Sequence, residues 1–97
     1  MNNLLKPIIM ENLIKLAEKY DIEKIILFGS RAIGKNSERS DIDLAVLGKN
    51  VRDFSFDAEE YIPTLLKFDI TDLTDPHGKA FLDEIHRTGV VIYEKTR

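Results

Sequence analysis

Asp41 and Asp43 are separated by one residue in the segment Ser40-Asp41-Ile42-Asp43-Leu44-Ala45-Val46. Side chains alternate across a β-strand, so the two carboxylates would share one face while the apolar side chains face the core. Like charges this close repel by about 4 kcal/mol at 4 Å and an effective dielectric near 20. A cation between them would relieve that repulsion, and Mg²⁺ binds through one or two carboxylates plus substrate phosphates. The pair is therefore a candidate Mg²⁺ site, although taken alone it is more typical of a half-exposed strand with solvated charges.

A glycine and a serine, Gly29 and Ser30, directly follow the apolar run Ile25–Phe28. Glycine lets the backbone approach a ligand closely, and the free N–H groups of a helical turn starting there suit an anion. Ser30 could add a hydroxyl donor, and Arg31 and Arg39 could balance phosphate charge. The glycine and serine alone are typical of an ordinary turn. Placed one short loop before two carboxylates, they indicate a site for a nucleotide with its Mg²⁺.

A third carboxylate is expected, because two-metal phosphoryl chemistry usually needs one that also lies near the incoming hydroxyl. Asp69, Asp72 and Asp75 are the candidates. In a strand over Phe68–Leu73, alternation puts Asp69 on the face opposite the core and Asp72 on the apolar side. Asp75 lies beyond the strand. The pattern therefore favours Asp69.

Helices alternate with short strands in the hydrophobic pattern. The predicted helices are Asn3 to Tyr20 with its first turn near Pro7, Phe54 to Leu66 kinked or shortened by Pro63, and Pro76 to Arg87 with Ala80, Phe81, Leu82 and Ile85 on its apolar side and Gly89 after its end. The predicted strands are Ile25–Phe28, Asp41–Leu47, Phe68–Leu73 and Val90–Tyr93, with a short helical turn and polar loop over Arg31–Ser40. This order predicts a small α/β (α+β) domain, a mixed β-sheet flanked by helices, over residues 1–97.

Composition excludes several classes of protein. The chain has 97 residues, a formal net charge of −3 and no cysteine, so it offers neither a basic field for nucleic acid nor a disulfide or thiolate metal site. Its longest apolar runs are too short to cross a bilayer, and its first residues lack the features of a signal peptide. We therefore expect a cytoplasmic protein that binds neither nucleic acid nor membrane.

The motif as a whole resembles a known family. Gly29-Ser30, ten intervening residues, then Asp41-Ile42-Asp43, and a later strand bearing Asp69, are similar to the DNA polymerase β-like nucleotidyltransferase superfamily. More narrowly, the opening Gly-Ser-Arg-Ala and the ending Ser-Asp-Ile-Asp-Leu-Ala-Val resemble the minimal nucleotidyltransferases (MNT proteins), often antitoxins paired with HEPN-domain toxins. The likeness extends over nearly the whole chain, including the last strand.

The resemblance implies a mixed sheet flanked by helices, with ATP or another nucleoside triphosphate held through one or two Mg²⁺ ions. It implies that Asp41, Asp43 and Asp69 bind the metal and act in catalysis, and that Gly29 and Ser30 contact the triphosphate. The reaction would place a nucleoside monophosphate, AMP, on a hydroxyl and release pyrophosphate. The chain is too short for a separate acceptor domain, so a tyrosine of a partner HEPN toxin is the expected acceptor.

Two other hypotheses stay open. The chain could be a binding module that neutralises a toxin by covering it, or a nucleotide-binding subunit without transfer activity. Nucleotide preference and assembly as a homo-oligomer or hetero-oligomer are not predicted. His77 and His86 lie nine residues apart, so they would not share a helix face and are poor joint metal ligands.

Overall fold

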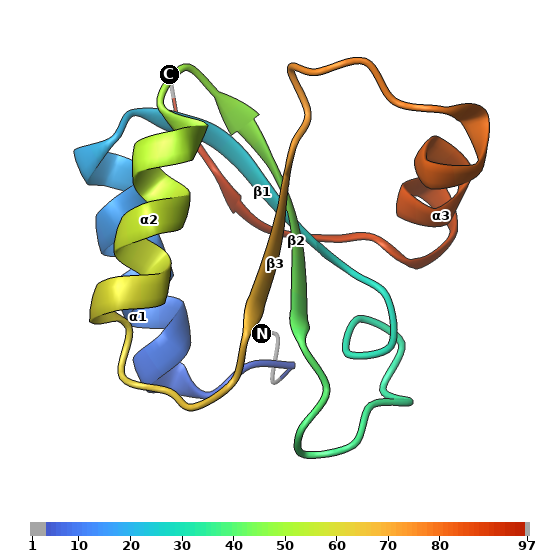
Figure 1. Cartoon of the computed structure of the whole chain (residues 1–97), viewed down its shortest axis with the longest axis horizontal. Coiled ribbons are helices and arrows are strands. Elements are labelled where there is room, and N and C mark those ends of the chain that lie inside the picture. Colours follow the sequence, from blue (N-terminus) through green and yellow to red (C-terminus); the bar gives the residue numbers. More distant parts are fainter. Residues whose placement is uncertain (1–3, 97) are drawn as a thin grey trace.

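The computed structural model describes residues 4–96, which form three helices and four strands (Figure 1). In chain order they are α1 (Pro7–Lys19), β1 (Ile22–Phe28), β2 (Ile42–Gly48), α2 (Val51–Tyr61), β3 (Phe68–Asp72), α3 (Lys79–Thr88) and β4 (Val90–Glu94). This is the mixed α/β fold that the pattern predicts. The expected helix start at Asn3 lies outside the described residues, and Pro7 occupies the first turn of α1, where its missing N–H costs nothing.

The four strands form one sheet in the order β3-β2-β1-β4. β1 pairs antiparallel with both β2 and β4, whereas β2 and β3 run parallel. A parallel pair needs a crossover connection, which here is α2. The parallel register decides the site, because it fixes which residue of β3 lies beside each residue of β2.

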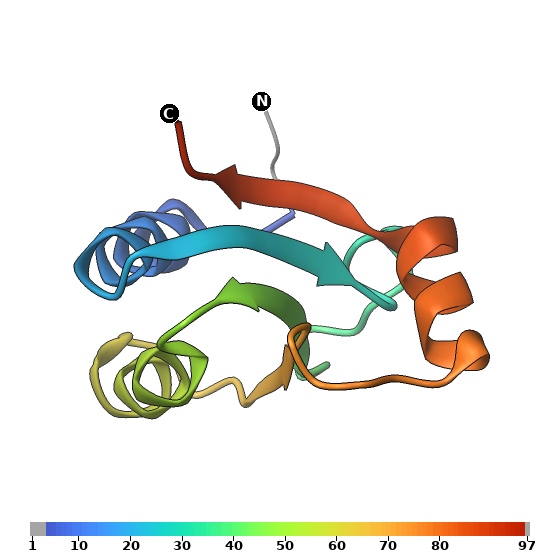
Figure 2. The ribbon, with the colours of Figure 1, turned by 90° about the horizontal axis from the view of Figure 1, so that it is seen from above.

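Helices cover both faces of the sheet. Helices α1 and α2 lie side by side on one face, and α3 stands on the other (Figures 1 and 2). Between the helix pair and the sheet lies a core of fully buried side chains that includes Leu13, Ile25, Leu27, Leu44 and Phe54. Hydrogen bonds also connect α2 with the end of α1, because the Tyr20 hydroxyl and the Lys19 ammonium both donate to the buried carboxylate of Asp57.

Helix α3 is attached more loosely than the other two helices. Thr88 is its one buried residue, and Phe81 and Ile85 are half-buried. The predicted apolar side was therefore only partly right, because Ala80 and Leu82 are exposed.

Several element boundaries differ from the prediction. Helix α2 begins at Val51. It ends at Tyr61, because Pro63 restricts the residue before it to extended conformations. Helix α3 begins at Lys79, not at Pro76. Strand β1 begins at Ile22, three residues earlier than expected, and Ile22 is fully buried.

No helix within residues 4–96 has both the length and the apolar character needed to cross a membrane.

Candidate active site

Asp43 and Asp69 lie side by side. They are direct partners in the parallel register of β2 and β3, so their side chains project from the same face of the sheet. The neighbouring pairs Ile42–Phe68 and Leu44–Ile70 point the other way, toward the core under α1 and α2. The structure thus brings together the two strand carboxylates that the sequence pattern singles out.

Asp41 lies directly before β2, on the same face of the sheet as Asp43. It precedes the first residue of β2 and is exposed, two residues from Asp43, so strand alternation directs it to the Asp43 side. It lies close enough to Asp43 for its charge to raise the pKa of the Asp43 carboxyl. Ile42 between them is fully buried and its N–H donates to the Lys67 carbonyl oxygen at 2.9 Å. The start of β2 is therefore fixed against β3.

The surroundings of Asp43 disfavour the charged form of its carboxyl group. Burial raises the pKa of its carboxyl above the ordinary value of 3.8, and repulsion from Asp69, Asp41 and Glu84 raises it further. The Arg31 guanidinium acts in the opposite direction but does not outweigh them. A cation beside Asp43 would remove both costs.

Gly29 provides space next to Asp43. A Cβ atom at this position would lie 2.5 Å from Oδ2 of Asp43, and the φ angle of +77° is in the left-handed region that favours glycine. Both backbone polar groups of Gly29 are engaged within the chain: its N–H donates to Thr88 Oγ1 at 3.0 Å and its carbonyl oxygen accepts from Ala32 N at 3.1 Å. What Gly29 offers at the site is therefore room for the carboxylate and for a close ligand.

Ser30 differs from its neighbour. Its carbonyl oxygen accepts from Lys35 N at 2.9 Å, but within residues 4–96 neither its N–H nor its hydroxyl makes a hydrogen bond. The residue is half-buried at the end of β1. Ser30 can thus present two donors to a phosphate without breaking an internal bond.

Arg31 closes the loop that leads to Asp41. Its side chain is only 8% exposed, and the guanidinium donates to the carbonyl oxygens of Glu38 (3.1 Å) and Ser40 (3.1 and 2.8 Å). Ser40 directly precedes Asp41, so this fork of hydrogen bonds positions the first carboxylate. Its predicted contact with phosphate stays a prediction, and the structure adds a positioning role that the sequence did not indicate.

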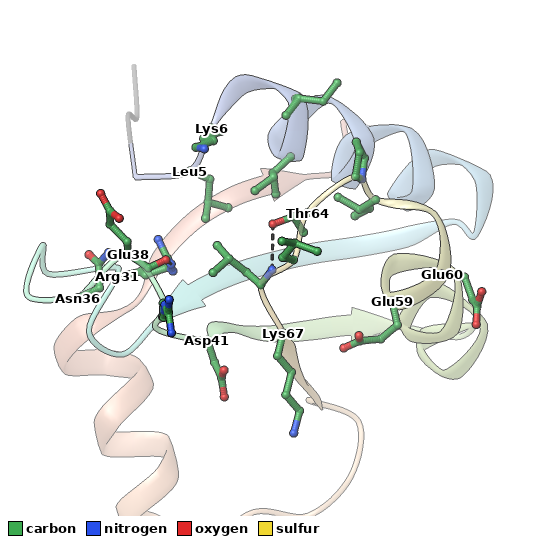
Figure 3. A pocket seen from close by; sticks show the side chains of 17 residues that line it. Leu5, Lys6, Arg31, Asn36, Glu38, Asp41, Glu59, Glu60, Thr64 and Lys67 are labelled. Atoms are coloured by element: carbon green, nitrogen blue, oxygen red, sulfur yellow. Dashed lines mark hydrogen bonds between the residues drawn. The ribbon is translucent and has the colours of Figure 1, made fainter.

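A groove of about 1440 Å³ opens beside Asp41 (Figure 3). Its lining includes Arg31, Arg39 and Asp41 as well as the segment from Ile62 to Lys67. Asp43 and Asp69 do not line it. The groove and the Asp43–Asp69 pair are thus separate surfaces that meet at Asp41, with Arg39 exposed on the groove side.

The three carboxylates do not form a closed cluster. Among residues 4–96 no three His, Cys, Asp or Glu side chains are gathered closely enough to hold an ion together. Mutual repulsion keeps unneutralised carboxylates apart, and the exposed side chains of Asp41 and Asp69 can rotate. The residues nevertheless suit Mg²⁺, because the donors are carboxylate oxygens on one face and Gly29 leaves the space beside Asp43 open.

Two residues of α3 reach this site, and the sequence did not identify either. Glu84 is half-buried and near enough to Asp43 to raise the pKa of the Asp43 carboxyl. Thr88 accepts the hydrogen bond from Gly29. Helix periodicity gives no sign of either contact, because both depend on where α3 packs against β1.

Comparisons with known proteins give a family model and two named relatives. The model of the family described as "Polymerase beta, Nucleotidyltransferase" matches residues 11–97. Two chains of Methanocaldococcus jannaschii, named "Putative protein adenylyltransferase MJ1215" and "Putative protein adenylyltransferase MJ0128", are each 32% identical to this chain. The matches cover 72% of this chain and 84% of the first relative, and 82% of this chain and 89% of the second.

Solved structures share the fold. A "toxin-antitoxin with AMP-PNP" has a TM-score of 0.68 at 22% identity, covering 89% of this chain and 73% of that one. A complex described as "tri-AMPylated Shewanella oneidensis HEPN toxin in complex with MNT antitoxin" has a TM-score of 0.65 at 19% identity, covering 94% and 74%. At these identities the likeness demonstrates a common architecture.

Proposed function

Because the chain belongs to the polymerase β nucleotidyltransferase family, we propose that it transfers AMP from ATP to a hydroxyl of a partner protein. The observation that carries the proposal is the register pairing of Asp43 with Asp69, beside the open turn at Gly29 and Ser30. The names of the two archaeal relatives support an adenylyl group and a protein acceptor.

Each residue has a distinct part in this proposal. Asp41, Asp43 and Asp69 hold one or two Mg²⁺ ions through their carboxylate oxygens. Ser30 donates its N–H and hydroxyl to the triphosphate, and Gly29 lets that phosphate come close to the backbone. Arg39, exposed beside Asp41, adds positive charge for the phosphates, and Arg31 adds its charge from beneath the loop, where its guanidinium holds the Glu38 and Ser40 carbonyl oxygens. Bound Mg²⁺ supplies charge neutralisation for the triphosphate and for the departing pyrophosphate.

The transfer is a single displacement at phosphorus. The acceptor oxygen forms a bond to the α-phosphorus of ATP, and the bond from that phosphorus to the oxygen bridging to the β-phosphate breaks, so that pyrophosphate leaves. Asp69 is the exposed member of the carboxylate pair, and it takes the proton from the acceptor hydroxyl. Positioning and charge stabilisation provide most of the rate.

The partner we propose is a HEPN-domain toxin, with a tyrosine hydroxyl as acceptor and this chain as the antitoxin. Structures of the same architecture are described as toxin–antitoxin complexes, one with AMP-PNP and one with an AMPylated HEPN toxin. We expect the reaction to take place in the cytoplasm.

The test is to incubate the chain with the proposed HEPN-domain partner, Mg²⁺ and radioactive ATP. Label at the α-phosphate is expected to reach the partner, and label at the γ-phosphate is not. Transfer from the γ-phosphate would indicate a kinase instead. Neutralisation of the toxin without any transfer would favour a module that acts by covering it.

A further inference from the structure

Thr88 joins the end of α3 to the turn at the candidate site. Its side chain is buried, and its hydroxyl donates to the Glu84 carbonyl oxygen at 2.9 Å while accepting from the Gly29 N–H at 3.0 Å. A hydroxyl has one proton to give and lone pairs to receive with, so both bonds form at once. Thr88 therefore fixes the direction of the first amide of the turn.

The position of Thr88 is itself well determined. Gly89, the next residue, donates to the Ile85 carbonyl oxygen at 2.8 Å. A Cβ atom on Gly89 would lie 2.9 Å from Ile26 Cγ2, so the end of α3 is pressed against β1. The ring of Phe81 packs edge-on against Phe28, with centroids 5.5 Å apart. These contacts hold the Thr88 hydroxyl over the last residues of β1.

Of the two residues of the turn, Gly29 and Ser30, only Ser30 has hydrogen-bond donors that the described chain leaves for a ligand. The Gly29 and Ser30 carbonyl oxygens accept from Ala32 and Lys35, at 3.1 and 2.9 Å. With the Gly29 N–H directed to Thr88, the N–H and hydroxyl of Ser30 are the unbonded donors of this residue pair within the described chain. The Gly29 amide is thus bonded within the protein, and the Ser30 amide is available to a ligand.

We infer that Thr88 is a positioning residue for nucleotide binding, which holds the Gly29 N–H inward so that Ser30 alone of the pair donates to the triphosphate. This inference rests on the proposed function. It assigns the Gly29 amide to the protein in both the free and the nucleotide-bound states. The chemical class of ligand is a nucleoside triphosphate with its divalent cation.

Amide NMR spectra of the full chain test the inference without any substitution. On titration with AMP-PNP and Mg²⁺, the Ser30 amide resonance is expected to shift strongly. The Gly29 amide is expected to keep its slow exchange with solvent, because its bond to the buried Thr88 persists. Loss of Gly29 protection on binding would mean that this amide leaves Thr88 for the phosphate, and would overturn the inference.

Two variants of Thr88 test how much its hydrogen bonds contribute to the affinity for AMP-PNP. Thr88→Val keeps the shape but removes both hydrogen bonds, and it is expected to weaken AMP-PNP binding about tenfold by calorimetry. Thr88→Ser retains the hydroxyl and should bind like the wild type. Ile9→Val, a buried change in α1, is the control for general loss of stability and should also bind like the wild type.

The outcomes separate the inference from the function beneath it. If the wild type binds AMP-PNP with Mg²⁺ and a folded Thr88→Val binds equally well, the inference is wrong and the proposed function stands. If the wild type does not bind AMP-PNP, the proposed function and the inference both fail. If Thr88→Val does not fold, the wild-type NMR titration still decides the question.

Discussion

Asp43 and Asp69 face each other across the parallel pairing of β2 and β3, although 25 residues separate them in sequence. Parallel partners point to the same side of a sheet, so no side-chain rearrangement is needed to bring the two carboxylates to one face. The apolar pairs on either side of them, Ile42–Phe68 and Leu44–Ile70, pack into the core and lock the register. A shift of one residue would send Asp69 into the core.

This pairing makes Asp69 the member of β3 whose charge matters. Asp69→Asn keeps the shape of the side chain but removes a metal ligand and a proton acceptor. We expect the gain in AMP-PNP affinity on adding Mg²⁺ to be at least about tenfold smaller in this variant than in the wild type. We expect AMP transfer to be about 10²- to 10⁴-fold slower. Asp75→Asn is the matched control, because Asp75 is exposed beyond the end of β3. Equal losses in both variants, or none in Asp69→Asn, would contradict the assignment.

Two glycines in left-handed conformations allow a paired test of the space beside Asp43. Gly29→Ala and Gly34→Ala both place a side chain at φ above +70°, which costs about 1–2 kcal/mol of unfolding free energy each. An added Cβ meets nothing within 4 Å at Gly34, whereas at Gly29 it lies 2.5 Å from Asp43. We expect thermal unfolding to fall in both variants, further in Gly29→Ala, and Mg²⁺-dependent AMP-PNP binding to fall only in Gly29→Ala. Unchanged binding in Gly29→Ala would exclude the proposed role of this space.

The raised pKa of Asp43 predicts the direction in which the stability of the protein changes with pH. The folded protein holds this proton more tightly than the unfolded chain, so the contribution of Asp43 to stability falls as pH rises from about 3.8 through the raised pKa, and then levels off. Without Mg²⁺, Asp43→Asn is expected to have the higher melting temperature at pH 7, with the difference shrinking toward pH 3. A cation that binds the folded state stabilises it, so Mg²⁺ should raise the melting temperature of the wild type more than that of the variant. A wild type that is the more stable protein at pH 7 without Mg²⁺ would contradict this account.

Arg31 should matter for the loop as well as for any ligand. Arg31→Lys retains the charge but cannot reproduce the fork that bonds the Glu38 and Ser40 carbonyl oxygens. We expect a loss of about 2 kcal/mol of unfolding free energy in urea titrations. Arg39→Lys, at an exposed position of the same loop, should change stability by less than about 0.5 kcal/mol. Equal stability of the two variants would show that the Arg31 fork does not hold the loop.

Strand alternation was enough to predict the shared face of the carboxylates. It applied to Asp43 and Asp69 separately, because each lies between apolar residues in its own strand. Alternation could not predict that β2 and β3 are neighbours in parallel register, since that depends on how the crossover through α2 packs. Pro63 was expected to kink or shorten its helix, and the helix ends before it, because the restriction acts locally.

The contacts of Arg31 and Thr88 were beyond sequence reasoning for a different reason. An arginine near phosphate-binding residues has two plausible uses, and only closure of the loop decides whether its guanidinium meets backbone carbonyl oxygens. Thr88 ends a helix whose predicted apolar side was partly wrong, so nothing in the spacing indicated its hydrogen bond to Gly29. Both are long-range consequences of packing.

The most direct test of the central claim is the intact mass of the partner HEPN protein after incubation with ATP, Mg²⁺ and this chain. The wild type should add the mass of one or more adenylyl groups, Asp43→Asn should add none, and Asp75→Asn should match the wild type. An unmodified partner with the wild type, or equal modification with Asp43→Asn, would contradict the claim that the Asp43–Asp69 pair carries the transfer.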